Sequence, residues 1–211
     1  MKIPGNFVTY SLLILVLSLN ACGGLTQSNK PAMKTWWLEP YTDITPVGSA
    51  VPDLFLSVSV TVVPGLDTDR ILTLSDNAEL NQYSAARWAE NLPELLASLT
   101  SRTLESSGRF QVVSARAANR EQSCNLHLDL HEFFADLNPS GQTTGVRLAV
   151  NGRYQCGSAE AVSLRVSASI PVQSNRMDVI VAAFQRAMDT VMQEILLEIP
   201  AGQQYQDLSD R

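Results

Sequence analysis

CNLHLDLHEFF, residues 124–134, and GVRLAVNGRYQC, residues 145–156, are the two runs that decide how the chain folds. In both runs apolar and polar residues alternate, and a period of two is typical of a β-strand that buries one face. Between them lies NPSGQTT, residues 138–144, which contains the Asn, Pro, Ser and Gly that favour turns. The sequence therefore predicts a β-hairpin.

A hairpin centred on Ser140 gives a definite pairing of the two strands. Leu130 then lies opposite Val150, and Cys124 lies opposite Cys156 on the apolar face. In an oxidising compartment such a cysteine pair forms a cross-strand disulfide. Two unpaired buried thiols are the alternative.

The hairpin also contains both histidines of the chain, His127 and His131, with Asp129 between them. The alternation places all three on the polar face. Four residues along a strand span about 13 Å, which is too far for two ligands that each bind one zinc ion at about 2 Å. We therefore expect a polar surface here and no metal site.

The same patterns predict the elements on either side of the hairpin. Strands are expected at residues 35–41, 54–63, 109–113 and 161–171. One helix is expected to begin at an Asn91 cap with Pro93 in its first turn and to end at Gly108. Its apolar stripe comprises Trp88, Leu92, Leu95, Leu99 and Thr103. A second amphipathic helix begins near Met177 and ends before Pro200.

Three aspartates and two tryptophans could have either a structural or a functional role. Asp67, Asp69 and Asp76 fall in a segment expected to be a solvated loop. Trp36 and Trp37 are expected to cover the core and the sheet edge, with stacking on a ligand as the alternative. The predicted fold is a single α/β (α+β) domain with a mainly antiparallel sheet and two amphipathic helices packed on one face.

The N-terminal residues have the layout of a bacterial export signal, with Lys2, then an apolar run at residues 7–19, then small residues. LNAC, residues 19–22, resembles the lipobox of bacterial lipoproteins. The resemblance implies cleavage before Cys22 and a lipid on its sulfur. Gly23, where inner-membrane lipoproteins tend to have Asp, implies the outer membrane. The alternatives are an ordinary secreted protein and, less well supported by an apolar run this short, a permanent membrane span.

These assignments give the expected organisation: a signal peptide at residues 1–21, a flexible tether at 22–34, the folded domain at 35–200 and a polar tail at 201–211. The chain of 211 residues has a net charge of −6 and no cluster of Lys and Arg, so nucleic acid is not an expected partner. The motifs of serine hydrolases, nucleotide-binding loops and dinucleotide-binding folds are absent from the sequence. We expect a binding or assembly protein and not an enzyme.

The segment from Val63 to Val113 resembles the auxiliary lipoprotein family of MCE-type ABC transporters, the PqiC-like lipoproteins. Three parts of it carry the resemblance: an LDR.I stretch, an ARWA..L..LL stretch and an L..SGRF..V stretch. The matching residues are Leu66, Asp67, Arg70 and Ile71, then Ala86, Arg87, Trp88, Ala89, Leu92, Leu95 and Leu96, then Leu104, Ser107, Gly108, Arg109 and Phe110. The insertion of Thr68 and Asp69 spreads the first motif by two residues.

The resemblance implies a non-enzymatic component of a lipid-transport system, held at the periplasmic face of the outer membrane by the lipid on Cys22. Its implied partner is the periplasmic MCE protein, and no cofactor is implied beyond that covalent lipid. A lipoprotein that itself carries lipid in a cavity between helix and sheet is the alternative. A membrane-anchored hydrolase is less favoured, because no nucleophile and base are paired in the sequence. The oligomeric state is left open, a homo-oligomer included.

Overall fold

The computed structural model describes residues 32–44, 55–112 and 123–199, and the part of the chain from Met33 onward forms one unit. The predicted signal peptide, Cys22 and the predicted tail at residues 201–211 lie outside the described residues. The first element of the described residues is a strand that begins at Lys34, one residue before the expected start of the domain.

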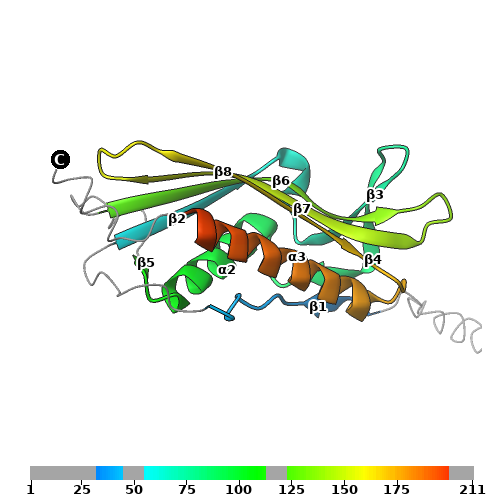
Figure 1. Ribbon diagram of the computed structural model, residues 1–211. Coiled ribbons are helices and arrows are strands. Elements are labelled where there is room, and N and C mark those ends of the chain that lie inside the picture. Colours follow the sequence, from blue (N-terminus) through cyan, green and yellow to red (C-terminus); the bar gives the residue numbers. More distant parts are fainter. Residues whose placement is uncertain (1–31, 45–54, 113–122, 200–211) are drawn as a thin grey trace, which may run out of the picture. The chain divides into compact units, whose positions relative to one another are not determined.

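The described residues form an eight-stranded sheet and two α-helices (Figure 1). The strands are β1 (Lys34–Trp36), β2 (Phe55–Val62), β3 (Arg70–Ser75), β4 (Leu80–Trp88), β5 (Gln111–Val112), β6 (Ser123–Leu137), β7 (Thr143–Cys156) and β8 (Val162–Pro171). The helices are α2 (Leu92–Ser106) and α3 (Met177–Glu198), and a 3-10 turn, η2 (Pro64–Leu66), follows β2.

The predicted hairpin is confirmed as β6 and β7, and its pairing near the cysteines is the predicted one. Leu130 pairs with Val150, and Cys124 pairs with Cys156. A bulge at His131 then shifts the pairing by one residue, which reverses the faces of the rest of β6. Phe133, which pairs with Leu148, therefore lies in the core, and Phe134 lies on the other side of the sheet.

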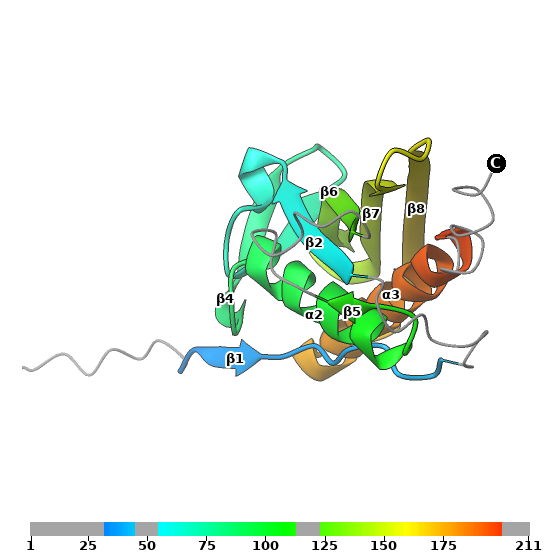
Figure 2. The ribbon, with the colours of Figure 1, turned by 90° about the vertical axis from the view of Figure 1, so that its left-hand side faces the viewer.

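The longest ladders of the sheet are antiparallel, between β6 and β7 and between β7 and β8. The sheet is nevertheless mixed, because β2 runs parallel to β6 over eight residue pairs and β3 runs parallel to the other end of β6. Both helices pack on one face of this sheet (Figure 2). The α+β class with two helices on one face is confirmed.

The structure contains a hairpin that the sequence did not predict: β3 and β4 pair in antiparallel fashion. Asp67, Asp69 and Asp76, predicted in a polar loop, lie outside the two strands. Trp88, predicted on the apolar stripe of the first helix, is the last residue of β4, and its N–H donates to the Asp69 carbonyl at 2.7 Å. The four-residue step from Trp88 to Leu92 matches a helical turn only by coincidence.

The helix boundaries otherwise follow the sequence signals. Asn91 occupies the N-cap position of α2 and Pro93 its first turn, but the Asn91 side chain makes no capping hydrogen bond. Gly108, with φ of +67°, follows the helix and lets the chain turn away. α3 ends at Glu198, before Pro200 as predicted.

The segment after β1 lies against the side of the helices that faces away from β2, β6, β7 and β8 (Figures 1 and 2). We call residues 37–44 the strap. The Gln185 side chain of α3 accepts from the Glu39 N–H at 2.8 Å and donates to its carbonyl at 2.9 Å. The Tyr41 N–H donates to Thr103 of α2 at 3.1 Å. Leu38 is fully buried, so the strap closes this side of the helix layer.

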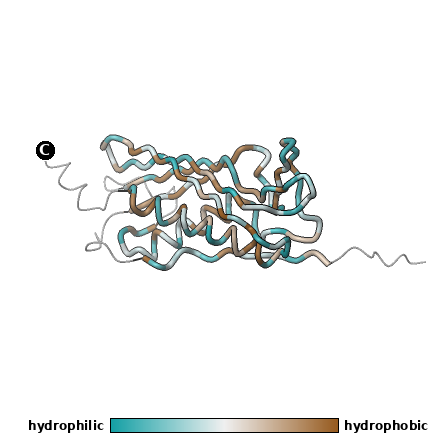
Figure 3. Tube along the Cα trace, turned by 45° about the vertical axis from the view of Figure 1, so that its right-hand side comes forward, coloured by the Kyte–Doolittle hydropathy of each residue, from teal (hydrophilic) through white to brown (hydrophobic). Residues whose placement is uncertain are grey.

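Aromatic side chains fill the interface between the helices and the sheet. Trp88, Phe133 and Phe184 are each less than 2 % exposed, and the three ring centroids lie 4.9 to 5.7 Å apart. Hydrophilic and hydrophobic residues alternate along the strands above the helices (Figure 3), as expected for a sheet with one covered face. None of the described helices is long and apolar enough to cross a membrane.

Candidate functional site

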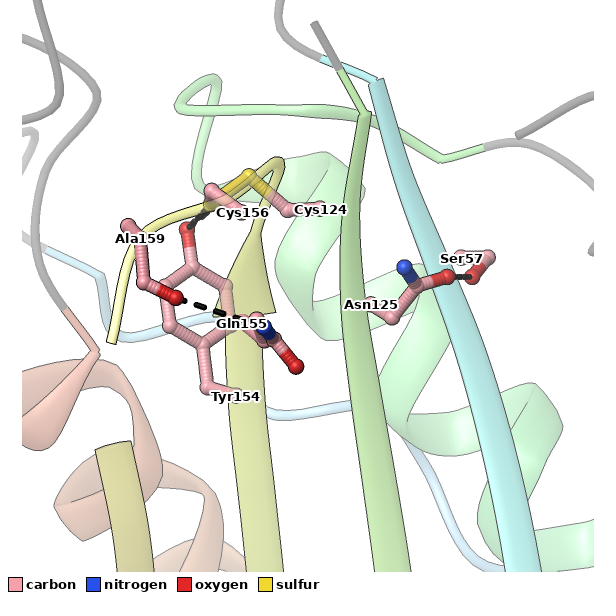
Figure 4. Close-up of a disulfide and its surroundings, with 7 residues drawn as sticks. All are labelled: Ser57, Cys124, Asn125, Tyr154, Gln155, Cys156 and Ala159. Atoms are coloured by element: carbon pink, nitrogen blue, oxygen red, sulfur yellow. Dashed lines mark hydrogen bonds between the residues drawn. A yellow bond between two sulfur atoms is a disulfide. The ribbon is translucent and has the colours of Figure 1, made fainter. Parts of the chain in front are cut away.

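The two hairpin cysteines form a structural and not a reactive site. The sulfurs of Cys124 and Cys156 are joined in a disulfide, and both residues are buried (Figure 4). The Tyr154 hydroxyl lies 2.9 Å from the Cys156 sulfur and 3.3 Å from the Cys124 sulfur. Because a disulfide sulfur carries no hydrogen, the hydroxyl is the donor. Next to this bond Ser57 of β2 donates to Asn125 of β6 at 2.5 Å, which ties the parallel strand to the hairpin.

The histidines lie on the open face of the sheet, as predicted. His127 contacts Ser59 at 3.0 Å, and Thr61 donates to Asp129 at 2.9 Å. His131 lies at the bulge, with Nε2 3.3 Å from Asp129. The described residues hold no group of three His, Cys, Asp or Glu that could bind a metal ion. The two histidines and Asp129 form part of a hydrogen-bonded polar network on the open face of the sheet.

The two tryptophans of the N-terminal segment, Trp36 and Trp37, differ in their burial. Trp36 is half-buried against the core, and its indole N–H has no hydrogen-bond partner among the described residues. Trp37 is 48 % exposed. The prediction of core and edge cover holds for Trp36, while Trp37 remains on the surface and available to another molecule.

Residues of the first two family motifs meet where β4 pairs with β1 on one side and with β3 on the other. Arg87 pairs with Thr35 on one side and with Arg70 on the other, so the three side chains share a face of the sheet. Arg87 Nε donates to the Thr35 hydroxyl at 3.2 Å, and both arginines lie within 3.6 Å of Asp69. Sequence reasoning predicted Asp69 in a solvated loop and did not bring these groups together.

The third motif has a structural role that its sequence does not reveal. Arg109 follows α2 and donates to the carbonyls of Leu196 at 2.7 Å and Ile199 at 2.6 Å. These two carbonyls lie at the C-terminal end of α3, where backbone acceptors lack helical partners. Burial lowers the pKa of Arg109, but a guanidinium stays charged at any physiological pH. Arg109 thus fastens the ends of the two helices.

A pocket of about 380 Å³ lies at the other end of the hairpin, between the β6–β7 turn and the start of α3. Its lining is uncharged and almost entirely polar: Asn138, Gln142, Thr143, Thr144, Val172, Gln173, Ser174 and Asn175. Asn175 accepts from the Thr143 hydroxyl at 2.7 Å, and that hydroxyl contacts Tyr83. Desolvation raises the pKa of Tyr83, so the phenol is neutral. Several of the polar groups that line the pocket are hydrogen-bonded to one another.

Comparison with solved structures identifies the same fold in other proteins. A Xanthomonas campestris protein assigned to the family model DUF330 aligns with a TM-score of 0.63 and 21 % identity, covering 84 % of this chain and 97 % of its own. An uncharacterized protein aligns with a TM-score of 0.63 and 13 % identity, covering 80 % and 99 %. The PelC dodecamer of Paraburkholderia phytofirmans aligns with a TM-score of only 0.37 and 12 % identity, covering 70 % and 95 %.

The sequence itself matches a family model. No curated protein matches the chain. The model described as "ABC-type transport auxiliary lipoprotein component" matches residues 42–196, a range that contains α2, every strand except β1, and all of α3 but its last two residues. The three motif stretches, the disulfide hairpin and Arg109 itself lie inside this range. The chain therefore belongs to the ABC-type transport auxiliary lipoprotein family.

Proposed function

We propose that the protein is a lipoprotein held by Cys22 at the periplasmic face of the outer membrane, where it docks the periplasmic MCE protein of an ABC transport system. In this role it is a non-enzymatic part of the route by which lipid passes between the inner and outer membranes. The observation that carries the proposal is the family match over residues 42–196, which makes an ABC transporter its functional partner.

The anchor is supported by the position of the folded unit relative to Cys22. The lipobox-like LNAC sequence ends at Cys22, and β1 begins only twelve residues later, at Lys34. Cys124 and Cys156 bind each other, so neither competes for the role of lipidated cysteine. A lipid attached at Cys22 would thus hold the domain close to the bilayer.

The alternative, a domain that carries lipid itself, needs an apolar cavity between helix and sheet. Trp88, Phe133 and Phe184 occupy that interface in mutual contact, and the pocket at the hairpin turn is lined with amides and hydroxyls. These contacts favour a domain that docks a protein partner over a domain that carries lipid. Phospholipid that copurifies stoichiometrically with the delipidated protein would reverse this preference.

Crosslinking in intact cells tests the docking claim. A photoreactive amino acid is placed at Ser59 or Arg165, both exposed on the open face of the sheet, and at Leu197, which is 78 % exposed on α3. We expect at least one position to capture an MCE protein, identified by mass spectrometry. Capture at none of them and none at Trp37, with the protein present at its normal level, would contradict the docking role.

A further inference from the structure

Two of the large apolar side chains that are most exposed among the described residues flank strand β1. Met33 is 43 % exposed and Trp37 is 48 % exposed. Each lies one residue beyond an end of β1, and both are exposed, whereas Trp36 between them packs against the core. Exposed indole and thioether groups at this place can contact an apolar or interfacial environment, such as the headgroup region of a membrane.

Cations lie beside these apolar groups. The guanidinium of Arg70 lies 3.9 Å from the Met33 sulfur, and Arg87 donates to Thr35. The side chains of Arg70 and Arg87 are 37 % and 49 % exposed, and the single carboxylate of Asp69 serves both. We call Met33, Thr35, Trp37, Asp69, Arg70 and Arg87 the β1 surface. It is locally cationic on a chain whose net charge is −6.

The β1 surface lies where the chain enters the fold. Met33 follows Cys22 by eleven residues, and a chain of that length reaches at most about 38 Å even when fully extended. A lipid on Cys22 would therefore keep this surface within reach of the bilayer at all times. Leu197, the most exposed apolar residue among those described, is far along the chain and has no comparable constraint.

We propose that the β1 surface rests on the phospholipid headgroups of the leaflet that holds the anchor. Trp37 and Met33 enter the interface, where indole rings are favoured, and Arg70 and Arg87 bind anionic phosphates. The contact adds binding by protein side chains to the binding by the lipid anchor. It also fixes which side of the domain faces away from the membrane. This inference rests on the proposed lipidation of Cys22.

The full lipidated protein, reconstituted into vesicles, provides the test. The vesicles contain phosphatidylethanolamine and phosphatidylglycerol with brominated acyl chains, which quench nearby indoles. Flotation first shows whether the protein is anchored. We expect tryptophan fluorescence of the wild-type protein to be quenched, and the quenching to be lost in Trp37→Phe, because Trp36 and Trp88 face the core.

Charge variants test the electrostatic part with a matched control. Arg70→Gln and Arg87→Gln should each lower the ratio of membrane-contacting to free domain about fivefold in these vesicles. Arg165→Gln, an exposed arginine on β8 at the opposite edge of the sheet, should leave quenching unchanged. Vesicles of phosphatidylcholine alone should show weaker quenching for the wild type and no difference among the arginine variants.

Each contrary result has a distinct meaning. Failure of the wild-type protein to float would overturn both the anchor and this inference. Flotation with equal quenching in wild type and Trp37→Phe would overturn only the membrane contact. Equal quenching in wild type and both arginine variants would also overturn it. Efficient crosslinking of an MCE protein through position 37, without quenching, would assign the β1 surface to protein docking instead.

Discussion

Arg109 shows how one side chain can join the ends of two helices. It follows the Gly108 turn after α2, and its guanidinium donates two short hydrogen bonds to the last carbonyls of α3. A planar fork of donors can serve two acceptors at once, and a cation is favoured at a helix C-terminus.

Arg109→Ala should therefore destabilise the domain. Loss of two charge-assisted hydrogen bonds is expected to lower the free energy of unfolding by about 2 kcal/mol. Denaturant unfolding measures the loss, and hydrogen exchange at the Ile199 amide, which donates to Ile195, reports fraying of α3. Arg109→Lys is the control: its ammonium lacks the fork and should recover only part of the stability. A stability equal to wild type in the alanine variant would contradict the clamp.

Two positions with positive φ give opposite predictions. Gly108 has φ of +67° with open space where a Cβ would stand, and Ala78 has φ of +63° in the β3–β4 turn. A side chain in this region costs about 1 kcal/mol. Gly108→Ala should lower stability by about that amount and Ala78→Gly should raise it. Thermal unfolding of both variants checks the pair, and shifts of the same sign would refute the argument.

Trp88 marks the limit of prediction from single residues. Its distance of four residues from Leu92 matches a helical stripe, and the periodicity of side chains alone cannot say where a strand gives way to a helix. Its position is instead fixed by pairing with Trp36 in β1 and by a backbone bond to Asp69. Trp36 is remote from Trp88 in the sequence, and Asp69 lies in a segment without clear periodicity.

At the scale of elements, the β6–β7 hairpin was the most predictable part of the fold. Strict alternation on both strands fixed the pairing from Leu130 to Cys124. The bulge at His131 was not predictable, because HEFFADL, residues 131–137, permits either Phe133 or Phe134 in the core. Packing against Trp88 and Phe184 decides for Phe133. Phe134 is instead covered by Arg147, whose guanidinium lies 4.7 Å from the ring centroid.

The disulfide should contribute strongly to the stability of this hairpin. It closes a loop with a sequence separation of 32 residues, which corresponds to about 3 to 4 kcal/mol in the chain-entropy model. Reduction of the wild type, or Cys124→Ala with Cys156→Ala, should lower the unfolding free energy by that amount. Mass spectrometry of unreduced protein is the control. Alkylation of both thiols before reduction would show that the bond is absent from the native protein.

The missed β3–β4 hairpin and the parallel ladders have a common cause. β3 buries three successive residues, Ile71, Leu72 and Thr73, and the first residues of β4 are exposed on both sides. Neither strand therefore shows the alternation that predicts a half-buried strand. The parallel pairing of β2 with β6 joins segments far apart in the sequence, and no local turn specifies it.

At the scale of the molecule, the anchor and the fold are expected to be separable. A chain carrying Cys22→Ser behind a general secretory signal in place of residues 1–21 should reach the periplasm folded and soluble. Its far-UV circular dichroism and unfolding midpoint should equal those of the delipidated wild type, and cell fractionation should find it outside the membranes. An unfolded product would show that the lipid contributes to folding.

The sequence predicted the chemistry of the molecule better than the location of its surfaces. The paired cysteines and the polar histidine row follow from local patterns. The β1 surface does not, because Met33, Arg70 and Arg87 come together only when β4 pairs with both β1 and β3. A helix clamp and a cationic edge are products of tertiary structure.

The strap also determines how the protein bears mechanical load. Under the proposed anchor, any tension between the outer membrane and a docked transporter enters the fold at Lys34. Three residues of β1 and the bonds from the strap to Gln185 and Thr103 carry that tension before it reaches the long ladders of β6. Under a pulling force, residues 34–44 should therefore detach first. The rest of the sheet should stay folded, and the docked complex should stay attached to the membrane through a longer tether.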